Sequence, residues 1–242
     1  MFIGMGSPIP RVSNLPGSRA GGGSTGLETV DNDFSMTFSN VDESYMPASN
    51  LRDELMAGNN KKVSFSGWYN VSSIGVNMTM FGTGFSNHGP ISIDTFGAYP
   101  RCRIKTSSGN SNIQGTSPEI IANQWQHFFL VIDLDDSVQT DTVKMYINGE
   151  RITTVTGTFP TSGSSFDLSQ NQPDVLINAW RTSPISVTAT TVQYDEFAFW
   201  NTVVDEKTIK NIYEANSASG KAANLSTVYP SNLKAWYRMG DN

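Results

Sequence analysis

The chain has 242 residues, of which 38% are apolar and only 16% are charged. This composition suits a β-sandwich with polar, uncharged loops and does not suit a helical bundle, which would be richer in Ala, Glu, Lys and Leu. The net charge of −6, with the basic residues scattered, argues against a nucleic-acid partner, because no basic stripe is present to neutralise phosphates.

Residues 1–26 differ in composition from the rest of the chain. Pro8, Pro10 and Pro16 keep the first part extended, and the glycine-rich run 20–26 predicts a flexible hinge. Six apolar residues are spaced along this segment: Phe2, Ile3, Met5, Ile9, Val12 and Leu15. We therefore expect an extended N-terminal arm with a Gly-rich hinge over 1–26, which docks on a partner, and one domain over 27–242. The alternative for the arm is a plain terminal tail.

Strand patterns dominate the chain from residue 27 onward. Apolar side chains alternate in 62–71, which places Val63, Phe65 and Tyr69 on one face of a strand. The run 126–133 is apolar almost without a break, so both of its faces should be covered. Further strands are expected at 75–81, 90–96, 101–106, 174–180 and 192–200.

A β-hairpin is the clearest local signal. The segments 142–147 and 151–155 are joined through Asn148 and Gly149, and an Asn-Gly pair suits a two-residue type I′ turn, in which both residues have positive φ. The face of the first strand that points into the core should carry Val143, Met145 and Ile147.

One helix is expected near the C-terminal end of the chain. Asp205 can cap its first turn, and Ile209, Ile212 and Tyr213 fall at the i, i+3 and i+4 positions of one face. The helix should end near 217–220, and a last strand should follow at 233–239.

Four segments in this order resemble the laminin-G-like jelly-roll family of the concanavalin-A-like lectin and glucanase superfamily. They are the aromatic strand at 63–69, the Trp-x-His strand and Asn-Gly hairpin over 125–149, the Asp-Glu strand at 194–201 with its following helix, and the closing strand at 233–239. The resemblance implies an all-β fold, a two-sheet antiparallel jelly-roll sandwich with one short helix. It also implies binding more often than catalysis, with a sugar or a calcium ion at the loop rim.

A second resemblance concerns the two ends of the chain. The Gly- and Pro-rich start at 3–17 and the closing 236–241 are similar to structural proteins of marine tailed phages. The first residues lack the basic and apolar segments of a secretory signal. No window approaches the ~18 apolar residues of a membrane span. We therefore expect a virion protein made in the host bacterial cytoplasm, with no membrane insertion.

Catalytic motifs are weak in this sequence, so we expect no enzyme. Glucanases of the superfamily need acidic residues alternating on one strand. Asp133 and Asp135 lack glutamate partners, and Asp195 and Glu196 are adjacent, so on a regular strand they would point to opposite faces. Of the two histidines, His88 lies in a loop and His127 heads a core strand, where we expect it to be packed and hydrogen-bonded.

Metal and thiol chemistry is also limited. Calcium is the metal that loop carboxylates suit, and the candidate ligands near strand ends are Asp94, Asp133, Asp135, Asp136 and Asp141. Solvated loop positions are the commoner role for such residues. The single cysteine, Cys102, is expected to be a half-buried strand residue. The alternative is a thiolate whose pKa is lowered by the flanking arginines.

Glycan binding would use exposed aromatic rings beside polar groups. The candidates near loops are Tyr99, Asn178, Trp180 and Arg181, and the alternative for each is a role in core or edge packing.

Two functions remain open at this stage. The first is a virion structural protein that docks through residues 1–26 on other capsid or tail proteins and displays the jelly roll as a capsid decoration, knob or fibre element. The second is a carbohydrate-binding adhesin for host surface polysaccharide, with calcium as a candidate cofactor. Both are compatible with a homo-oligomer.

Overall fold

The computed structural model describes residues 27–32, 35–39, 44–75, 77–83, 89–117, 119–169, 174–180, 186–187, 190–219 and 222–239. Of 180, 186–187 and 216–219 only the backbone is described. The arm residues Phe2, Ile3, Met5, Ile9, Val12 and Leu15, as well as His88 and Arg181, lie outside the described part of the chain.

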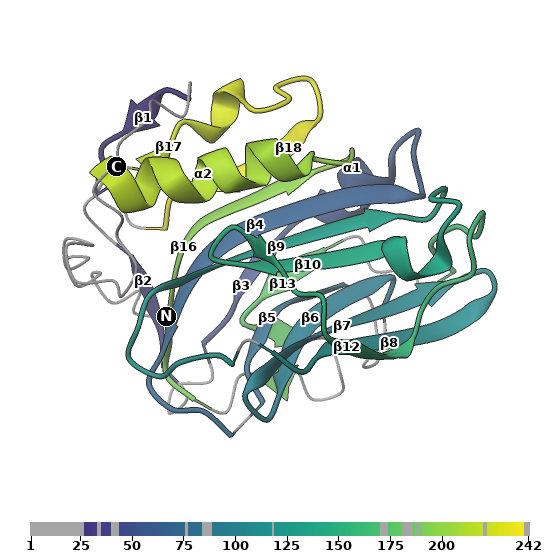
Figure 1. Ribbon diagram of the computed structural model, residues 1–242, viewed down its shortest axis with the longest axis horizontal. Helices are drawn as coiled ribbons and strands as arrows, with labels where there is room; N and C mark the ends of the chain where they lie inside the picture. Colours follow the sequence, from purple (N-terminus) through teal and green to yellow (C-terminus); the bar gives the residue numbers. More distant parts are fainter. Residues whose placement is uncertain are drawn as a thin grey trace.

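Two antiparallel sheets packed face to face form the molecule (Figure 1). The first sheet has the order β11-β10-β9-β4-β16-β18, and β2 also pairs with β16. Its strands are β2 (Met36–Phe38), β4 (Lys62–Val71), β9 (Gln126–Asp133), β10 (Val143–Ile147), β11 (Glu150–Arg151), β16 (Val192–Trp200) and β18 (Leu233–Tyr237). The predicted strands 62–71, 126–133 and 192–200 are therefore confirmed.

The second sheet has the order β12-β8-β7-β6-β5-β13-β3. Its strands are β3 (Met46–Ala48), β5 (Thr79–Thr83), β6 (Ile91–Phe96), β7 (Tyr99–Thr106), β8 (Gly109–Gly115), β12 (Val155–Thr158) and β13 (Val175–Ile177). Two short ribbons complete the strands: β1 (Thr29–Val30) with β17 (Ala222–Ala223), and β14 (Ala179–Trp180) with β15 (Ser186–Val187). The strand β8 was missed from the sequence, because its Asn- and Ser-rich composition gives no apolar alternation.

The main core lies between the two sheets. Val63, Phe65 and Tyr69 of β4 point into it as predicted, and β10 contributes Val143 and Met145. Both faces of β9 are covered, because Phe128, Leu130 and Ile132 belong to this core, whereas Phe129 and Val131 belong to a second cluster on the other side of the sheet.

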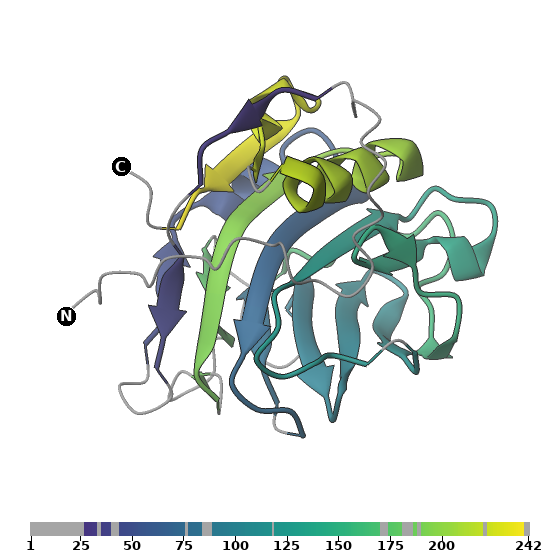
Figure 2. The same ribbon diagram turned by 60° about the vertical axis from the view of Figure 1, so that its left-hand side comes forward.

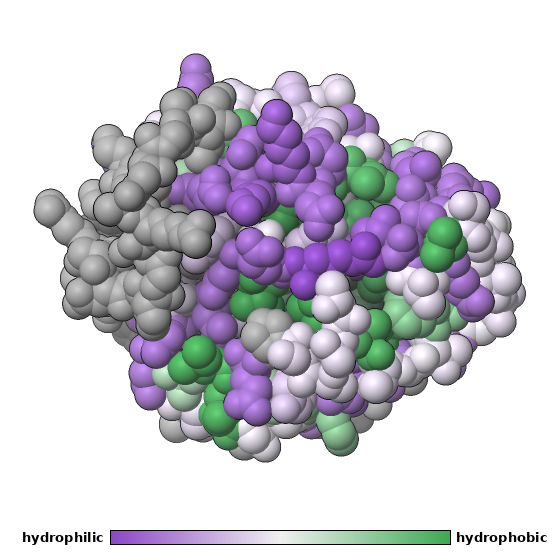
Figure 3. Space-filling model, viewed as in Figure 1, coloured by the Kyte–Doolittle hydropathy of each residue, from purple (hydrophilic) through white to green (hydrophobic). Residues whose placement is uncertain are grey.

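The second cluster is closed by α2 (Glu206–Ser219), which lies across the outer face of the first sheet (Figure 2). Ile209 and Ile212 are buried in the cluster, and the backbone N–H of Thr208 donates to Asp205 Oδ1 over 2.9 Å, so the predicted cap is confirmed. The surface over α2 is largely hydrophilic, and hydrophobic patches interrupt the surface below it (Figure 3). The shorter helix α1 (Leu51–Met56) and the 3-10 turns at Gln139–Asp141 and Leu225–Thr227 were not anticipated.

The hairpin turn has the conformation that its sequence predicts, but the expected second strand at 151–155 is wrong, because β11 spans only Glu150–Arg151 and Val155 begins β12 of the second sheet. Asn148 and Gly149 have φ values of 53° and 78°, as a type I′ turn requires. The Asn148 side chain adds a tertiary contact, since its Oδ1 accepts a hydrogen bond of 2.9 Å from the backbone N–H of His127 at the start of β9.

The first described segment of the chain, 27–32, is fixed against the C-terminal part of the domain. β1 pairs with β17, and the backbone N–H of Asn224 donates to Glu28 O over 2.7 Å. Asn32 Nδ2 donates to Asp195 Oδ2 over 2.8 Å. These bonds hold residue 27 at a defined place beside α2 and the ribbon β1–β17.

Candidate functional site

The outer face of the second sheet carries a row of cations along β7. Cys102 and Ile104 of β7 point into the core, so the alternate residues Arg101, Arg103 and Lys105 point outward. The neighbouring strands place polar side chains on the same face, because Arg101 is paired with Asp94 of β6 and with Gln114 of β8.

Asp94 holds both arginines. Its carboxylate is 0% exposed, and it accepts hydrogen bonds from Arg101 Nε at 2.7 Å and from Arg101 Nη2 at 2.9 Å. Arg103 Nη2 donates to the same carboxylate. Burial lowers the pKa of Arg103, while the Asp94 charge opposes that shift. Among the described residues, two guanidinium groups therefore share one buried carboxylate.

Phe96 is the aromatic side chain of this face. The residue is 54% exposed, and the guanidinium carbon of Arg101 lies 4.8 Å from the centre of its ring. The Arg101 side chain is therefore held by Asp94 on one edge and by the ring of Phe96 on one face, which fixes its orientation.

Amides and hydroxyls surround these groups on the neighbouring strands. Gln114 lies opposite Arg101, and Asn112 lies opposite Arg103. Thr156 and Thr158 of β12 continue the two rows, and of these four side chains only Gln114 is partly buried. We call the surface formed by Asp94, Phe96, Tyr99, Arg101, Asn112 and Gln114 the β7 face.

Tyr99, which the sequence singled out, lies at the end of the β7 face. It pairs with Phe96 across the β6–β7 turn, so both rings stand on the same side of the sheet. Its hydroxyl donates to Glu119 Oε1 over 3.1 Å, and this hydrogen bond raises the pKa of Tyr99. The chemistry of the β7 face is thus an exposed ring, a partly exposed phenol, an oriented arginine and two amides.

Asn178 does not share this surface. Its side chain is 1% exposed, it lies in the left-handed region with φ 65°, and its Nδ2 donates to Ser44 O over 2.8 Å. The prediction that Asn178 is a surface residue for a sugar is therefore wrong, because the amide is used to join two segments of the domain. Trp180 belongs to the short strand β14, and its side chain lies outside the described part of the structure.

A family model described as the concanavalin A-like lectin/glucanases superfamily matches residues 43–210, more than half of the chain. The chain belongs to this superfamily. The assignment agrees with the four motifs in the sequence and with the two-sheet sandwich. No curated protein matches the sequence.

Solved structures with the same fold are distant in sequence. The binding domain of Paraclostridial Mosquitocidal Protein 1 has a TM-score of 0.53 at 15% identity, covering 79% of this chain and 46% of that chain. A candidate carbohydrate-binding protein from Bacteroides ovatus has a TM-score of 0.52 at 16% identity, covering 74% and 45%. The binding domain of botulinum neurotoxin DC, in complex with SialylT, has a TM-score of 0.53 at 14% identity, covering 75% and 42%. The chain therefore spans less than half the length of these proteins, and the likeness is one of fold.

The superfamily includes glucanases, and the acidic pair of β16 lies differently from the sequence-based expectation. A β-bulge between Asp195 and Ala198 places Glu196 and Phe197 opposite Gly67, with Glu196 at φ 54°. Both carboxylates therefore lie on the outer side of the first sheet instead of on opposite faces.

The two carboxylates are nevertheless buried, and both are engaged in hydrogen bonds. Asp195 accepts from Asn32, and Glu196 Oε2 accepts from Trp236 Nε1 over 2.6 Å. Glu196 Oε1 also forms an ion pair with Arg238 at 3.7 Å. Both residues serve to fix β16 against its neighbours, which is a structural role and not the open acid pair of a glycosidase.

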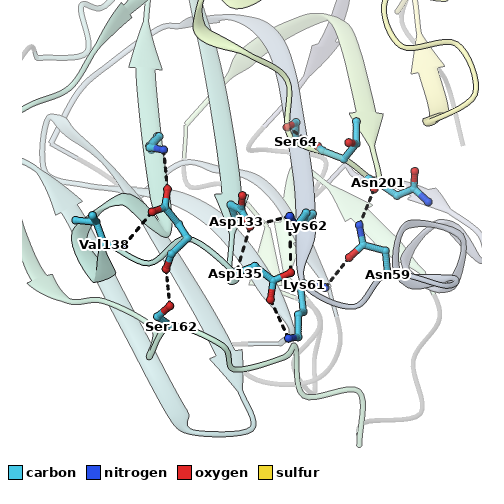
Figure 4. Close-up of polar contacts among 12 residues, drawn as sticks. Asn59, Lys61, Lys62, Ser64, Asp133, Asp135, Val138, Ser162 and Asn201 are labelled. Atoms are coloured by element: carbon cyan, nitrogen blue, oxygen red, sulfur yellow. Dashed lines mark hydrogen bonds and ion pairs between the residues drawn. The ribbon is translucent and has the colours of Figure 1, made fainter.

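The candidate calcium ligands are each paired with a cation. Asp133 Oδ1 lies 3.4 Å from Lys62 Nζ, and Asp135 Oδ1 lies 2.8 Å from Lys61 Nζ (Figure 4). The pairs Asp136–Lys144, Asp141–Arg151 and Asp94 with its two arginines complete the set. Among the described residues no group of three or more His, Cys, Asp or Glu side chains could hold a metal ion. In the described part of the structure, each of these five carboxylates is therefore held in an ion pair with a lysine or an arginine.

His127 and Cys102 are core residues. His127 is buried, its Nε2 lies 2.8 Å from Ser66 Oγ, and its ring packs against Trp68, as the sequence predicted. Burial lowers its pKa to about 3, so it is neutral at physiological pH. Cys102 is fully buried and burial raises the pKa of its thiol, so the alternative of a reactive thiolate is wrong.

Sequence reasoning missed Phe96, Arg101 and Gln114. The available signal was the alternation of Arg101 and Arg103 about Cys102, which implies that both arginines leave the core on the same side. Within the described residues no helix is long and apolar enough to cross a membrane.

Proposed function

We propose that this chain is a carbohydrate-binding domain that binds sugars on the β7 face. The observation that supports the proposal best is the exposed ring of Phe96 beside the oriented guanidinium of Arg101. Sugars use apolar ring surface for stacking and nearby polar groups for orientation, and both are present here on one surface. The binding domains of similar fold support the same class of function.

The strands behind the site give it rigidity. Arg101 is bonded to Asp94 in two places, and the register β6–β7–β8 fixes Gln114 and Asn112 beside it. A preformed set of donors loses little conformational entropy when a ligand binds, so a small site of this kind can bind without rearrangement.

A glycan array with the full-length protein tests the proposal. Phe96→Ala should reduce binding about tenfold or more, because stacking of a ring on a sugar is lost. The matched control is Val138→Ala, which also removes an exposed apolar side chain (52% exposed). Val138 lies on the loop after β9, where its backbone N–H donates to Asp136. If the array is blank, or if both variants bind as the natural chain does, the β7 face is not a sugar site.

We also propose, as a second function, that the protein is a structural component of a phage particle that docks through residues 1–26 on capsid or tail proteins. The supporting observation is the attachment of 27–32 to β17, Asn224 and Asp195, which would give the preceding arm a fixed point of departure. Display in many copies would raise the avidity of weak sugar sites for host polysaccharide, so the two functions are compatible.

Particle incorporation tests this second function. A chain without residues 1–26 should be absent from purified particles, whereas Phe96→Ala should be incorporated normally. Normal incorporation of the shortened chain would contradict the docking role.

A further inference from the structure

We infer that the β7 face selects saccharides that carry a carboxylate or a sulfate group, and that Arg101 is the residue that selects them. The inference rests on the proposed sugar-binding function. It goes beyond it because it names the chemical class of the ligand and the residue that recognises it.

The guanidinium of Arg101 has one edge available. Asp94 takes the edge formed by Nε and Nη2. Among the described residues Nη1 has no hydrogen-bond partner, and the side chain retains 10% exposure. The edge formed by Nη1 and the second hydrogen of Nη2 presents two parallel donors, which is the geometry that a carboxylate or a sulfate accepts.

The burial of the Asp94 cluster strengthens the attraction of Arg101 for an anion. Three cations of β7 point outward. Among the described residues Asp94 pairs with Arg101 and Arg103, and Asp167 Oδ2 lies 2.9 Å from Lys105 Nζ. Because Asp94 is fully buried and the Arg101 side chain is only 10% exposed, the guanidinium is poorly solvated, and a hydrogen bond from it to a ligand anion would be stronger than one from a solvated lysine.

One carboxylate opposes this preference. Glu119 accepts the hydrogen bond of Tyr99 at the edge of the β7 face, so its charge would repel an anionic sugar more than a neutral one. The structure thus offers two changes with opposite expected effects on the same ligand: removal of the Arg101 charge and removal of the Glu119 charge.

The test uses the full-length protein and an array that contains carboxylated, sulfated and neutral glycans of matched backbones. We expect the anionic members to bind about tenfold or more tightly than their neutral counterparts, and the binding to weaken as salt is added. The ranking of carboxylated against sulfated members distinguishes the two sources of the anion. Equal binding of anionic and neutral members would overturn the inference and leave the sugar-binding function intact. A blank array would overturn both.

Variants assign the selection to Arg101. Arg101→Lys keeps the charge but loses the paired donors, so it should weaken the binding of anionic members several-fold more than the binding of neutral members. Glu119→Gln changes a surface residue outside the Asp94 cluster. It therefore tests the preference for anionic members even if Arg101 variants fold poorly. It should strengthen binding of anionic members several-fold and leave neutral members unchanged. An unchanged anionic preference in both variants would contradict the role of Arg101.

Discussion

Gly67 of β4 lies directly against the ring of Phe197 in β16. A Cβ atom placed at residue 67 would come within 2.4 Å of both Cδ1 and Cε1 of that ring. Gly67 is also the residue that two residues of the bulge, Glu196 and Phe197, face. The absence of a side chain at 67 therefore allows Phe197 to enter the core while the bulge turns Glu196 outward.

Gly67→Ala should destabilise the domain by about 1–3 kcal/mol, because the new methyl group forces Phe197 or its strand to move. Urea denaturation measures the change. Gly115→Ala is the control, since its nearest contact, Ile152 Cγ2 at 3.3 Å, is the end of a side chain and can shift. Equal stability of the two variants would show that the bulge does not depend on Gly67.

Asn148→Ala should destabilise the domain by about 1–3 kcal/mol. The variant keeps a residue with φ 53° and leaves the backbone N–H of His127 without its acceptor. Asn123→Ala separates the two causes, because Asn123 has φ 58° but no side-chain hydrogen bond among the described residues. If Asn148→Ala lowers the free energy of unfolding no more than Asn123→Ala does, the whole effect comes from the backbone conformation and none from the lost hydrogen bond.

The free energy of unfolding of the domain should decrease as the pH is lowered, because His127 is buried in its neutral form. The folded-state pKa of His127 is about 3, below its ordinary value, because the buried ring stays neutral. Below about pH 6.5 the unfolded chain binds a proton that the folded chain does not, so this group costs about 1.4 kcal/mol for each pH unit down to its folded pKa.

The comparison with His127→Asn measures this contribution. The natural chain should be more stable than the variant at pH 7, and the difference in free energy of unfolding should shrink as the pH falls from 6 to 4. A difference that stays constant over this range would contradict a neutral buried His127.

Cys102 should not react with a thiol reagent in the folded protein. Its side chain is fully buried and burial raises the pKa of the thiol, so neither access nor thiolate is available. A colorimetric thiol titration should detect no fast-reacting group at pH 8 and one group per chain after denaturation. Fast labelling of the native protein would contradict the burial.

Much of the fold was predictable because its signals are local. The alternation in β4, the Asn148–Gly149 turn and the Asp205 cap depend on residues that are close in sequence, and each was found where the sequence placed it. Asn178 was misjudged, because the sequence places it near the end of the expected strand 174–180 and close to a loop, whereas neighbouring segments of the domain bury it.

The sequence by itself determined the superfamily, the longer strands of the first sheet and the turn of the hairpin, since periodicity and turn chemistry act over a few residues. Only the tertiary structure decided which charged groups meet. It paired Asp94 with Arg101 and Arg103, and it brought the aspartates at the end of β9 to the lysines at the start of β4. It also turned Asp195 and Glu196 to one side of the sheet through a bulge. The reason is physical: strand register and bulges join residues far apart in sequence, and a shift of one residue moves a side chain to the opposite face.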